Sequence, residues 1–148
     1  MEKRFETFTT LIAKISRNIR KIKTEEVSEF NLKGLHVSCL YYLFKHKSLT
    51  SKGLCEVCEE DKAAISRSIE YLEENGYIQC ESKTEKRYKC PLTLTKKGRQ
   101  IGEKITKKVD NIVNIASEGL TEANRKLFYD SLILISDNLQ KYSDKYEE

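Results

Sequence analysis

Residues 49–98 decide the fold, and they read LTSKGLCEVCEEDKAAISRSIEYLEENGYIQCESKTEKRYKCPLTLTKKG. Near the start, the expected inner face of a helix carries Leu54, Cys55, Val57 and Cys58. Thr50 or Ser51 offers a hydroxyl that can accept a backbone N–H at a helix N-terminus. The acidic residues 59–61 then interrupt the apolar pattern. The pattern therefore predicts a short helix that opens at residue 50 or 51.

A second helix is expected after this interruption, with Asp61 as its N-terminal cap. The buried face should carry Ala64, Ile65, Ile69 and Leu72, and Asn75-Gly76 supplies a left-handed stop. The opposite face carries small and basic side chains, namely Lys62, Ala63, Ser66 and Arg67, beside Glu70. Because small residues allow a close backbone approach and basic ones reach outward, this face suits a groove of duplex DNA.

A hairpin is predicted next. Residues 77–82 and 88–94 have the residue types and alternation of strands, and the segment between them, 83–87, is mostly cationic. Pro91 lacks an amide donor, so it fits an edge strand or a bulge. Two short helices followed by a basic hairpin predict a winged helix-turn-helix, in a fold that is mainly α with a small β-hairpin wing.

These residues resemble the MarR-type (multiple antibiotic resistance) family of transcription regulators. The similarity spans nearly the whole chain, and it is most specific at Leu49-Thr50, at residues 61–67 (DKAAISR), at residues 72–78 (LEENGYI) and at residues 94–98 (LTKKG). The resemblance implies an obligate dimer that binds short inverted repeats in double-stranded DNA, commonly a repressor released by a small ligand or by oxidation.

The predicted DNA contacts follow from the helix faces and the charge. A group on the second helix should enter the major groove, two hydroxyl residues should touch phosphate, and basic wing residues should grip the neighbouring backbone or minor groove. The expected major-groove residues are Lys62, Ala63, Ala64, Ser66 and Arg67. The expected phosphate contacts are Thr50 and Ser51, and the expected wing contacts are Lys83, Lys86 and Arg87. A twofold dimer would place its recognition helices about 34 Å apart and require a pseudo-palindromic site.

The terminal segments should hold the two copies together. Apolar residues recur at helical spacing in the first segment, and again in a long helix after Gly98 that reaches about Ser117 and in a last helix capped by Thr121. A further helix, roughly 31–45, should form the floor of the DNA-binding lobe. We therefore expect one domain over residues 1–148, with dimerisation helices in 1–30 and 99–148 and a DNA-binding lobe in 31–98.

Composition agrees with this interpretation. The chain has 148 residues and a net charge of +4, which is a small basic excess. The positions of the basic residues, on the second helix and in the wing, are more informative than their number. No stretch reaches the roughly 18 consecutive apolar residues of a membrane span, and residues 1–4 lead into no apolar signal core, so we expect no membrane partner and a cytoplasmic protein.

The five cysteines leave more than one interpretation open. Cys55 and Cys58 have a spacing seen in redox and zinc motifs, yet they fall on the expected inner face of a short helix, where cysteine packs as a small apolar group. Core packing is therefore preferred, with a thiol-based redox regulator using Cys55 and Cys58 as the alternative. No second Cys pair and no His pair stands at finger-like spacing from Cys55 and Cys58, so no metal or other cofactor is predicted.

A small aromatic effector is expected from the resemblance, which places a ligand pocket between the dimer helices and the DNA lobe. The candidate residues for this site are Phe8, Ile12, His36, Leu40 and Tyr41. Core packing remains the competing interpretation for each of them, and for a lone histidine beside apolar residues we expect a buried position with its hydrogen bonds satisfied.

Two other classes compete with a DNA-binding regulator. An enzyme with Cys55 or Cys58 as nucleophile would need a neighbouring base, and the sequence offers none nearby, so no catalytic residue is predicted. A winged helix used only for protein contacts would show no salt-dependent binding to DNA.

Overall fold

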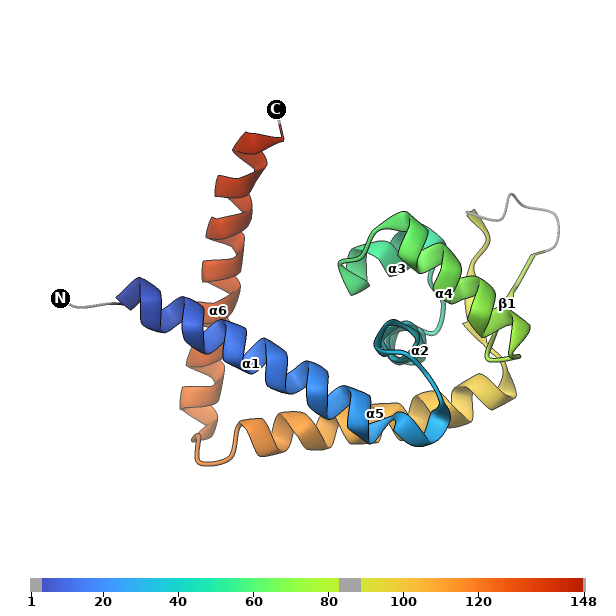
Figure 1. Ribbon diagram of the computed structural model, residues 1–148, viewed down its shortest axis with the longest axis horizontal. Helices are drawn as coiled ribbons and strands as arrows, with labels where there is room; N and C mark the ends of the chain where they lie inside the picture. Colours follow the sequence, from blue (N-terminus) through green and yellow to red (C-terminus); the bar gives the residue numbers. More distant parts are fainter. Residues whose placement is uncertain (1–3, 83–88, 148) are drawn as a thin grey trace. The chain divides into compact units, whose positions relative to one another are not determined.

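The computed structural model describes residues 4–82 and 89–147, with side chains from residue 6 onward. The predicted class is confirmed, because the chain is mostly helical with one small antiparallel hairpin (Figure 1). The helices are α1 (Arg4–Glu26), α2 (Gly34–His46), α3 (Ser51–Cys58), α4 (Lys62–Glu74), α5 (Lys96–Ala116) and α6 (Glu122–Ser143). The strands are β1 (Ile78–Cys80) and β2 (Leu92–Leu94), and short 3-10 turns cover Ser28–Phe30 and Asp144–Tyr146.

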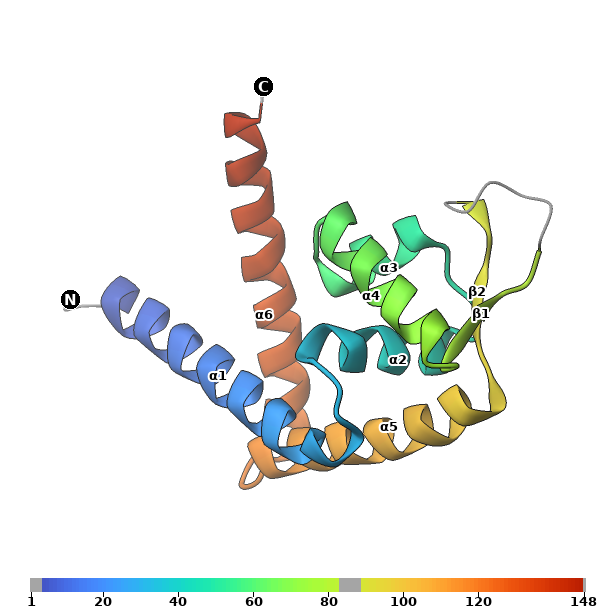
Figure 2. The same cartoon turned by 45° about the vertical axis from the view of Figure 1, so that its right-hand side comes forward.

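The chain forms two compact units, residues 1–110 and 111–148. In the first unit α2 lies beside α3, α4 and the hairpin, and the core is built around it (Figure 2). Its fully buried large side chains include Leu40, Leu43, Leu54, Ile65, Leu72 and Ile105. These residues come from four different helices, so burial of their apolar faces fixes α3 and α4 on the α2 floor.

The hairpin is shorter than the sequence suggests. Ile78 pairs with Leu94 and Cys80 with Leu92, so each strand has only three paired residues rather than the six or seven expected. One further bond runs from the Glu81 amide to the Pro91 carbonyl at 3.0 Å. Pro91 has no N–H with which to return a bond, so the regular ladder stops there.

A second difference concerns the start of α2. The expected boundary was near residue 31, but the helix begins at Gly34, because Asn31 adopts a left-handed conformation at φ 53° that ends the preceding 3-10 turn. The backbone N–H of Lys33 then donates a hydrogen bond to Nδ1 of His36, with 3.2 Å between the two nitrogen atoms. This bond satisfies the backbone donor of the N-cap residue, as the side chain at the third helical position does in a capping box.

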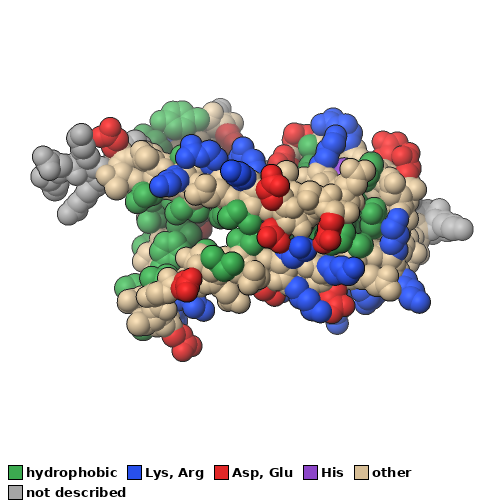
Figure 3. Space-filling view, turned by 60° about the horizontal axis from the view of Figure 1, so that its bottom comes forward, with side chains coloured by type: hydrophobic (Ala, Val, Ile, Leu, Met, Phe, Trp, Pro, Cys, Tyr) green, Lys and Arg blue, Asp and Glu red, His purple; other side chains and the backbone are tan. Residues whose placement is uncertain are grey.

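The second unit contains the end of α5, a turn and α6. Gly119 forms the turn at φ 84°, and the Thr121 hydroxyl accepts the Asn124 amide at 3.2 Å, which confirms both the break and the predicted cap. No residue of α6 is buried within the chain. Leu127 and Leu134 are 65% and 61% exposed, and hydrophobic side chains lie open on the molecular surface in Figure 3.

Among the described residues, no helix combines the length and apolar character needed to cross a membrane.

Candidate nucleic-acid interface

Two side-chain caps fix where the helices of the helix-turn-helix begin. The Thr50 hydroxyl accepts the Gly53 amide at 3.1 Å, and the Asp61 carboxylate accepts the Ala64 amide at 2.8 Å. Each cap satisfies a backbone donor that the first helical turn leaves without a partner. Both predicted starts are confirmed, with Thr50 as the cap and Ser51 as the first residue of α3.

The two faces of α4 divide as the sequence predicts. Ile65, Ile69 and Leu72 are buried in the core, together with Ser68. The outward face carries Lys62, Ala63, Ser66 and Arg67, all of which are exposed, and Ala64 is partly exposed between the two faces. The chain therefore presents a helix face with small side chains near its start and an exposed guanidinium one turn later.

The C-terminal end of α4 is held by the start of α5. The Lys97 ammonium donates to the Asn75 carbonyl at 2.8 Å and lies 4.3 Å from the centre of the Tyr77 ring. The Thr95 hydroxyl donates to the Gly76 carbonyl at 2.6 Å, and Gly76 adopts φ 75°, which confirms the left-handed stop. Lys97 therefore stabilises the fold at this point, which leaves it less free to meet a nucleic acid.

The wing is joined to the helix-turn-helix by an isolated bridge. Leu49 and Leu92 exchange two backbone hydrogen bonds, at 2.9 and 3.2 Å. Leu49 comes directly before the Thr50 cap, so strand β2 and the first turn of α3 share a fixed connection. Half-buried Thr50 and Ser51, predicted to touch phosphate, therefore lie next to the base of the wing.

The predicted wing contacts Lys83, Lys86 and Arg87 lie outside the described residues. Just beyond each end of this segment, the structure shows a feature that the sequence interpretation did not contain. Cys80 in β1 and Cys90 ahead of β2 form a disulfide, with their Cα atoms 5.9 Å apart. The two cysteines lie in the expected strands of one hairpin, and that placement is the signal that could have revealed the pair.

The other three cysteines are free. Cys39 is fully buried, whereas Cys55 and Cys58 are half-buried and pack against the core. A hydrogen bond from the Cys39 thiol lowers the pKa of Cys58, and the positive charge of Lys23 contributes in the same direction, whereas the pKa of Cys39 is raised. No group of three potential metal ligands occurs within residues 4–82 and 89–147.

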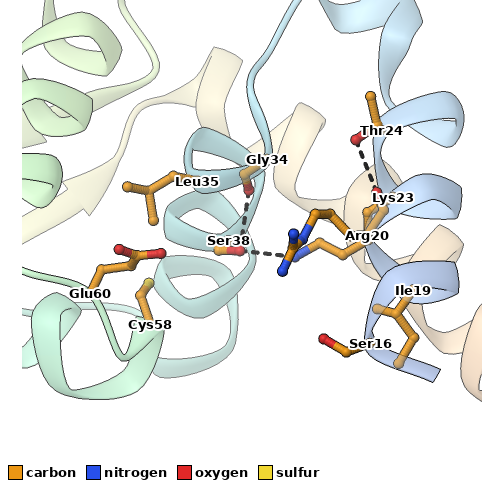
Figure 4. A pocket seen from close by; sticks show the side chains of 10 residues that line it. All are labelled: Ser16, Ile19, Arg20, Lys23, Thr24, Gly34, Leu35, Ser38, Cys58 and Glu60. Carbon is orange, nitrogen blue, oxygen red and sulfur yellow. Dashed lines mark hydrogen bonds between the residues drawn. The ribbon is translucent and has the colours of Figure 1, made fainter. Parts of the chain in front are cut away.

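A pocket of about 360 Å³ lies between α1 and the helices α2 and α3 of the first unit (Figure 4). The lining residues are Ser16, Ile19, Arg20, Lys23, Thr24, Gly34, Leu35, Ser38, Cys58 and Glu60. The Lys23 ammonium donates to the Ser38 hydroxyl at 3.0 Å across it. Two cationic groups, Arg20 and Lys23, therefore come from the α1 side, and the Glu60 carboxylate comes from the other.

None of the predicted effector residues lines this pocket. Phe8 and Ile12 lie further toward the start of α1, Leu40 is fully buried and Tyr41 is partly buried on α2. Arg20, Lys23 and Ser38 do line the pocket, and no sequence motif marks them for it. The basic residues of α1 lie on faces other than its apolar stripe, and this is the sequence feature that could have indicated a cationic pocket wall.

His36 is buried and its hydrogen bond is satisfied, as predicted for a core histidine. It is 7% exposed, it accepts the Lys33 amide, and it stacks on Tyr71 with ring centres 4.2 Å apart. Burial, and then the charge of Lys33, lower the pKa of His36 below its usual value. The neutral ring is therefore the form that the fold stabilises.

Comparison with known proteins agrees with this geometry. Residues 35–113 match the family described as the winged helix DNA-binding domain. The structure is similar to a solved MarR, at 26% identity over 93% of both chains with a TM-score of 0.72. It is also similar to a putative MarR family transcriptional regulator from Listeria monocytogenes complexed with 26mer DNA, at 25% identity over 94% of this chain and 90% of that one with a TM-score of 0.79.

A third similar structure is the Staphylococcus aureus MarR in complex with salicylate and kanamycin. Identity is 20% over 95% of both chains, with a TM-score of 0.81. No curated protein matches this chain in sequence.

Proposed function

Because this chain belongs to the winged helix DNA-binding domain family and is a MarR-type transcriptional regulator, we propose that it acts as a dimeric repressor on a pseudo-palindromic operator. The observation that carries the proposal is the division of α4 into a buried apolar face and an exposed face with Lys62, Ser66 and Arg67. Such a face can enter a major groove, where Arg67 would donate to a guanine edge. The Listeria relative with bound DNA supports the same use.

Phosphate contacts would position the helix. Thr50 and Ser51 lie at the start of α3, where helix N-terminal amides favour an anionic oxygen. Lys83, Lys86 and Arg87 of the wing are proposed to add cationic contacts to the backbone or minor groove. A transcription regulator of this family must reach chromosomal DNA, which lies in the bacterial cytoplasm. We therefore propose a cytoplasmic location for the chain.

Dimerisation is proposed because the described part of the chain leaves too much apolar surface uncovered. Along α1, the side chains Leu11, Ile12, Ile15, Ile19 and Ile22 are each at least 40% exposed. The exposed hydrophobic residues of α6 include Leu127, Ile133, Leu134 and Leu139. Contiguous apolar patches of this kind mark protein interfaces. We therefore propose that residues 1–30 and 99–148 contain the dimerisation helices and that residues 31–98 form the DNA-binding lobe. Ile105 of α5 is buried in the core of that lobe, so α5 would contribute to the dimer through its other faces.

The pocket between α1 and α2 is the proposed effector site. Its volume of about 360 Å³ lies at the lower end of the range for small-molecule sites. Arg20 and Lys23 would pair with a carboxylate, and Ile19 and Leu35 offer apolar contact, so a small aromatic acid fits this lining. The Staphylococcus relative bound to salicylate supports that class of ligand.

The test is binding of a fluorescent duplex from the DNA upstream of the chain's own gene, measured by anisotropy at several salt concentrations. Arg67→Ala should weaken specific binding by about 1–3 kcal/mol and relax base preference. Lys45→Ala, at an exposed position on α2 outside both the proposed DNA contacts and the proposed dimerisation helices, is the matched control and should bind as the unchanged protein does. Failure of the purified protein to bind any duplex at low ionic strength would refute the function.

The effector is tested in the same assay. Salicylate should release the duplex from the unchanged protein, and Lys23→Ala should raise the concentration needed, because one of the two cations in the pocket is lost. Equal sensitivity in both proteins would remove the pocket from the proposal while leaving DNA binding intact.

A further inference from the structure

The Cys80–Cys90 disulfide closes the base of the wing. Cys80 is the last residue of β1, and Cys90 precedes β2 by one residue, Pro91. The bond therefore ties the two places where the chain enters and leaves residues 81–89. This segment contains the predicted cationic contacts Lys83, Lys86 and Arg87.

The two cysteine residues differ in accessibility. Cys90 is fully buried, whereas Cys80 is half-buried. The Ser82 carbonyl oxygen lies 3.2 Å from each sulfur. It can accept a thiol hydrogen once the bond is broken, so the reduced pair would also find a polar partner in the fold. A small reagent would reach the pair at the Cys80 sulfur.

The base of the wing is also the point where β2 meets the helix-turn-helix. Cys90 lies two residues before Leu92, and Leu92 exchanges two backbone hydrogen bonds with Leu49. Leu49 precedes the Thr50 cap of α3. A change at the disulfide therefore acts on a strand that is hydrogen-bonded to the start of α3.

We propose that Cys80 and Cys90 form a reversible thiol–disulfide site that sets the affinity of the wing for DNA. The inference rests on the proposed DNA-binding function and adds a mode of regulation to it. It assigns the redox chemistry to the wing pair, instead of the Cys55 and Cys58 pair that the sequence suggested as an alternative.

The chemistry needs only small reagents of two classes. In reduction, the thiolate of a low-molecular-weight thiol attacks the Cys80 sulfur, and Cys90 leaves and takes a proton. A second reagent thiol then displaces Cys80, and the two reagents end as one disulfide. In oxidation, a hydroperoxide transfers one oxygen to Cys80 to give a sulfenic acid and an alcohol. The Cys90 thiol then displaces water from that sulfur, and the disulfide forms again.

The disulfide form should bind DNA more tightly. The bond joins the two strands of a hairpin that has only three paired residues on each side and lies next to the start of α3, and a more rigid hairpin loses less conformational freedom when it contacts a partner. A loss of freedom equal to that of one backbone residue corresponds to an affinity ratio of roughly 5- to 30-fold. We expect a difference of this size between the two redox forms.

The experiment compares two forms of the full chain on one operator duplex. One sample is kept in the disulfide form and the other is reduced with dithiothreitol, and alkylation followed by mass spectrometry reports the state of each cysteine. The reduced form should bind about 5- to 30-fold more weakly, and a hydroperoxide should restore the affinity. Cys80→Ser/Cys90→Ser should bind like the reduced form and respond to neither reagent.

Cys55→Ser is the matched control, because it removes a half-buried free cysteine outside the wing and should keep the full response. A response that persists in the Cys80→Ser/Cys90→Ser protein would overturn the inference, as would equal affinity of the two redox forms of the unchanged protein. If neither form bound any duplex, the proposed function itself would fall, and the inference with it.

Discussion

Gly98 is the position where one added methyl group should do the most damage. A Cβ atom placed there would lie 1.8 Å from the Tyr77 carbonyl oxygen and 2.8 Å from its carbon. Carbon and oxygen atoms normally approach no closer than about 3.3 Å. The start of α5 would therefore have to move away from the end of α4 by about 1.5 Å, and the opposing atoms are backbone, which cannot rotate aside.

The cost follows from what that movement breaks. The Thr95 amide donates to the Tyr77 carbonyl at 3.1 Å, and the Thr95 hydroxyl donates to the Gly76 carbonyl at 2.6 Å. Two lost hydrogen bonds cost about 1–3 kcal/mol, and overpacking adds about 1–3 kcal/mol. Alanine recovers about 1 kcal/mol of helix propensity. We expect Gly98→Ala to lower the free energy of unfolding by roughly 1–5 kcal/mol.

The assay is urea unfolding followed by circular dichroism at one fixed protein concentration. Gly34→Ala is the matched control, because a Cβ at Gly34, the first residue of α2, meets no atom within 4 Å. That variant should be neutral or slightly more stable. The reasoning about Gly98 is refuted if its alanine variant unfolds at the same urea concentration as the Gly34 variant or at a higher one.

Three further predictions concern the cap, the buried histidine and the interface. Asp61→Ala should lower the free energy of unfolding by about 1 kcal/mol through loss of the α4 cap, whereas Asp61→Asn should retain most of it; equal loss in both would contradict the cap. The lowered pKa of His36 means that the unfolded chain binds its proton more readily, so stability should be complete above about pH 6.5 and fall below it. Urea unfolding across that range should show a smaller acid loss in His36→Gln, and an unchanged loss would refute this role. Leu134→Glu should shift sedimentation from dimer to monomer, with Lys52→Glu, at an exposed position on α3 outside the proposed interface, as control; a dimer that persists would exclude Leu134 from the interface.

Local features of the fold were predictable from the sequence because their causes are local. The caps at Thr50, Asp61 and Thr121 each accept an amide three residues ahead in the chain, so the residue type alone indicates the helix start. The left-handed stop at Gly76 is of the same kind. The outward face of α4 followed from helical periodicity, because the core needs one apolar face and leaves the other to solvent.

Features that depend on contacts between distant segments were not predictable in the same way. The wing disulfide depends on hairpin register, which alternation alone does not set, and the strands ended early because Pro91 cannot donate a hydrogen bond. The pocket depends on how α1 packs against α2, and the Lys23–Ser38 bond that crosses it joins residues 15 positions apart. No spacing rule links such residues, so periodicity along the chain does not reveal this pocket.

The Leu49–Leu92 bridge also limits how this molecule can be redesigned. A wing transplanted from a relative would bring a new second strand, and that strand would have to accept backbone pairing from the residue ahead of α3. If residues 78–94 alone were exchanged, Leu49 would have to form its two backbone hydrogen bonds with a strand of different sequence. A working chimera should therefore take residue 49 and the hairpin from the same parent protein.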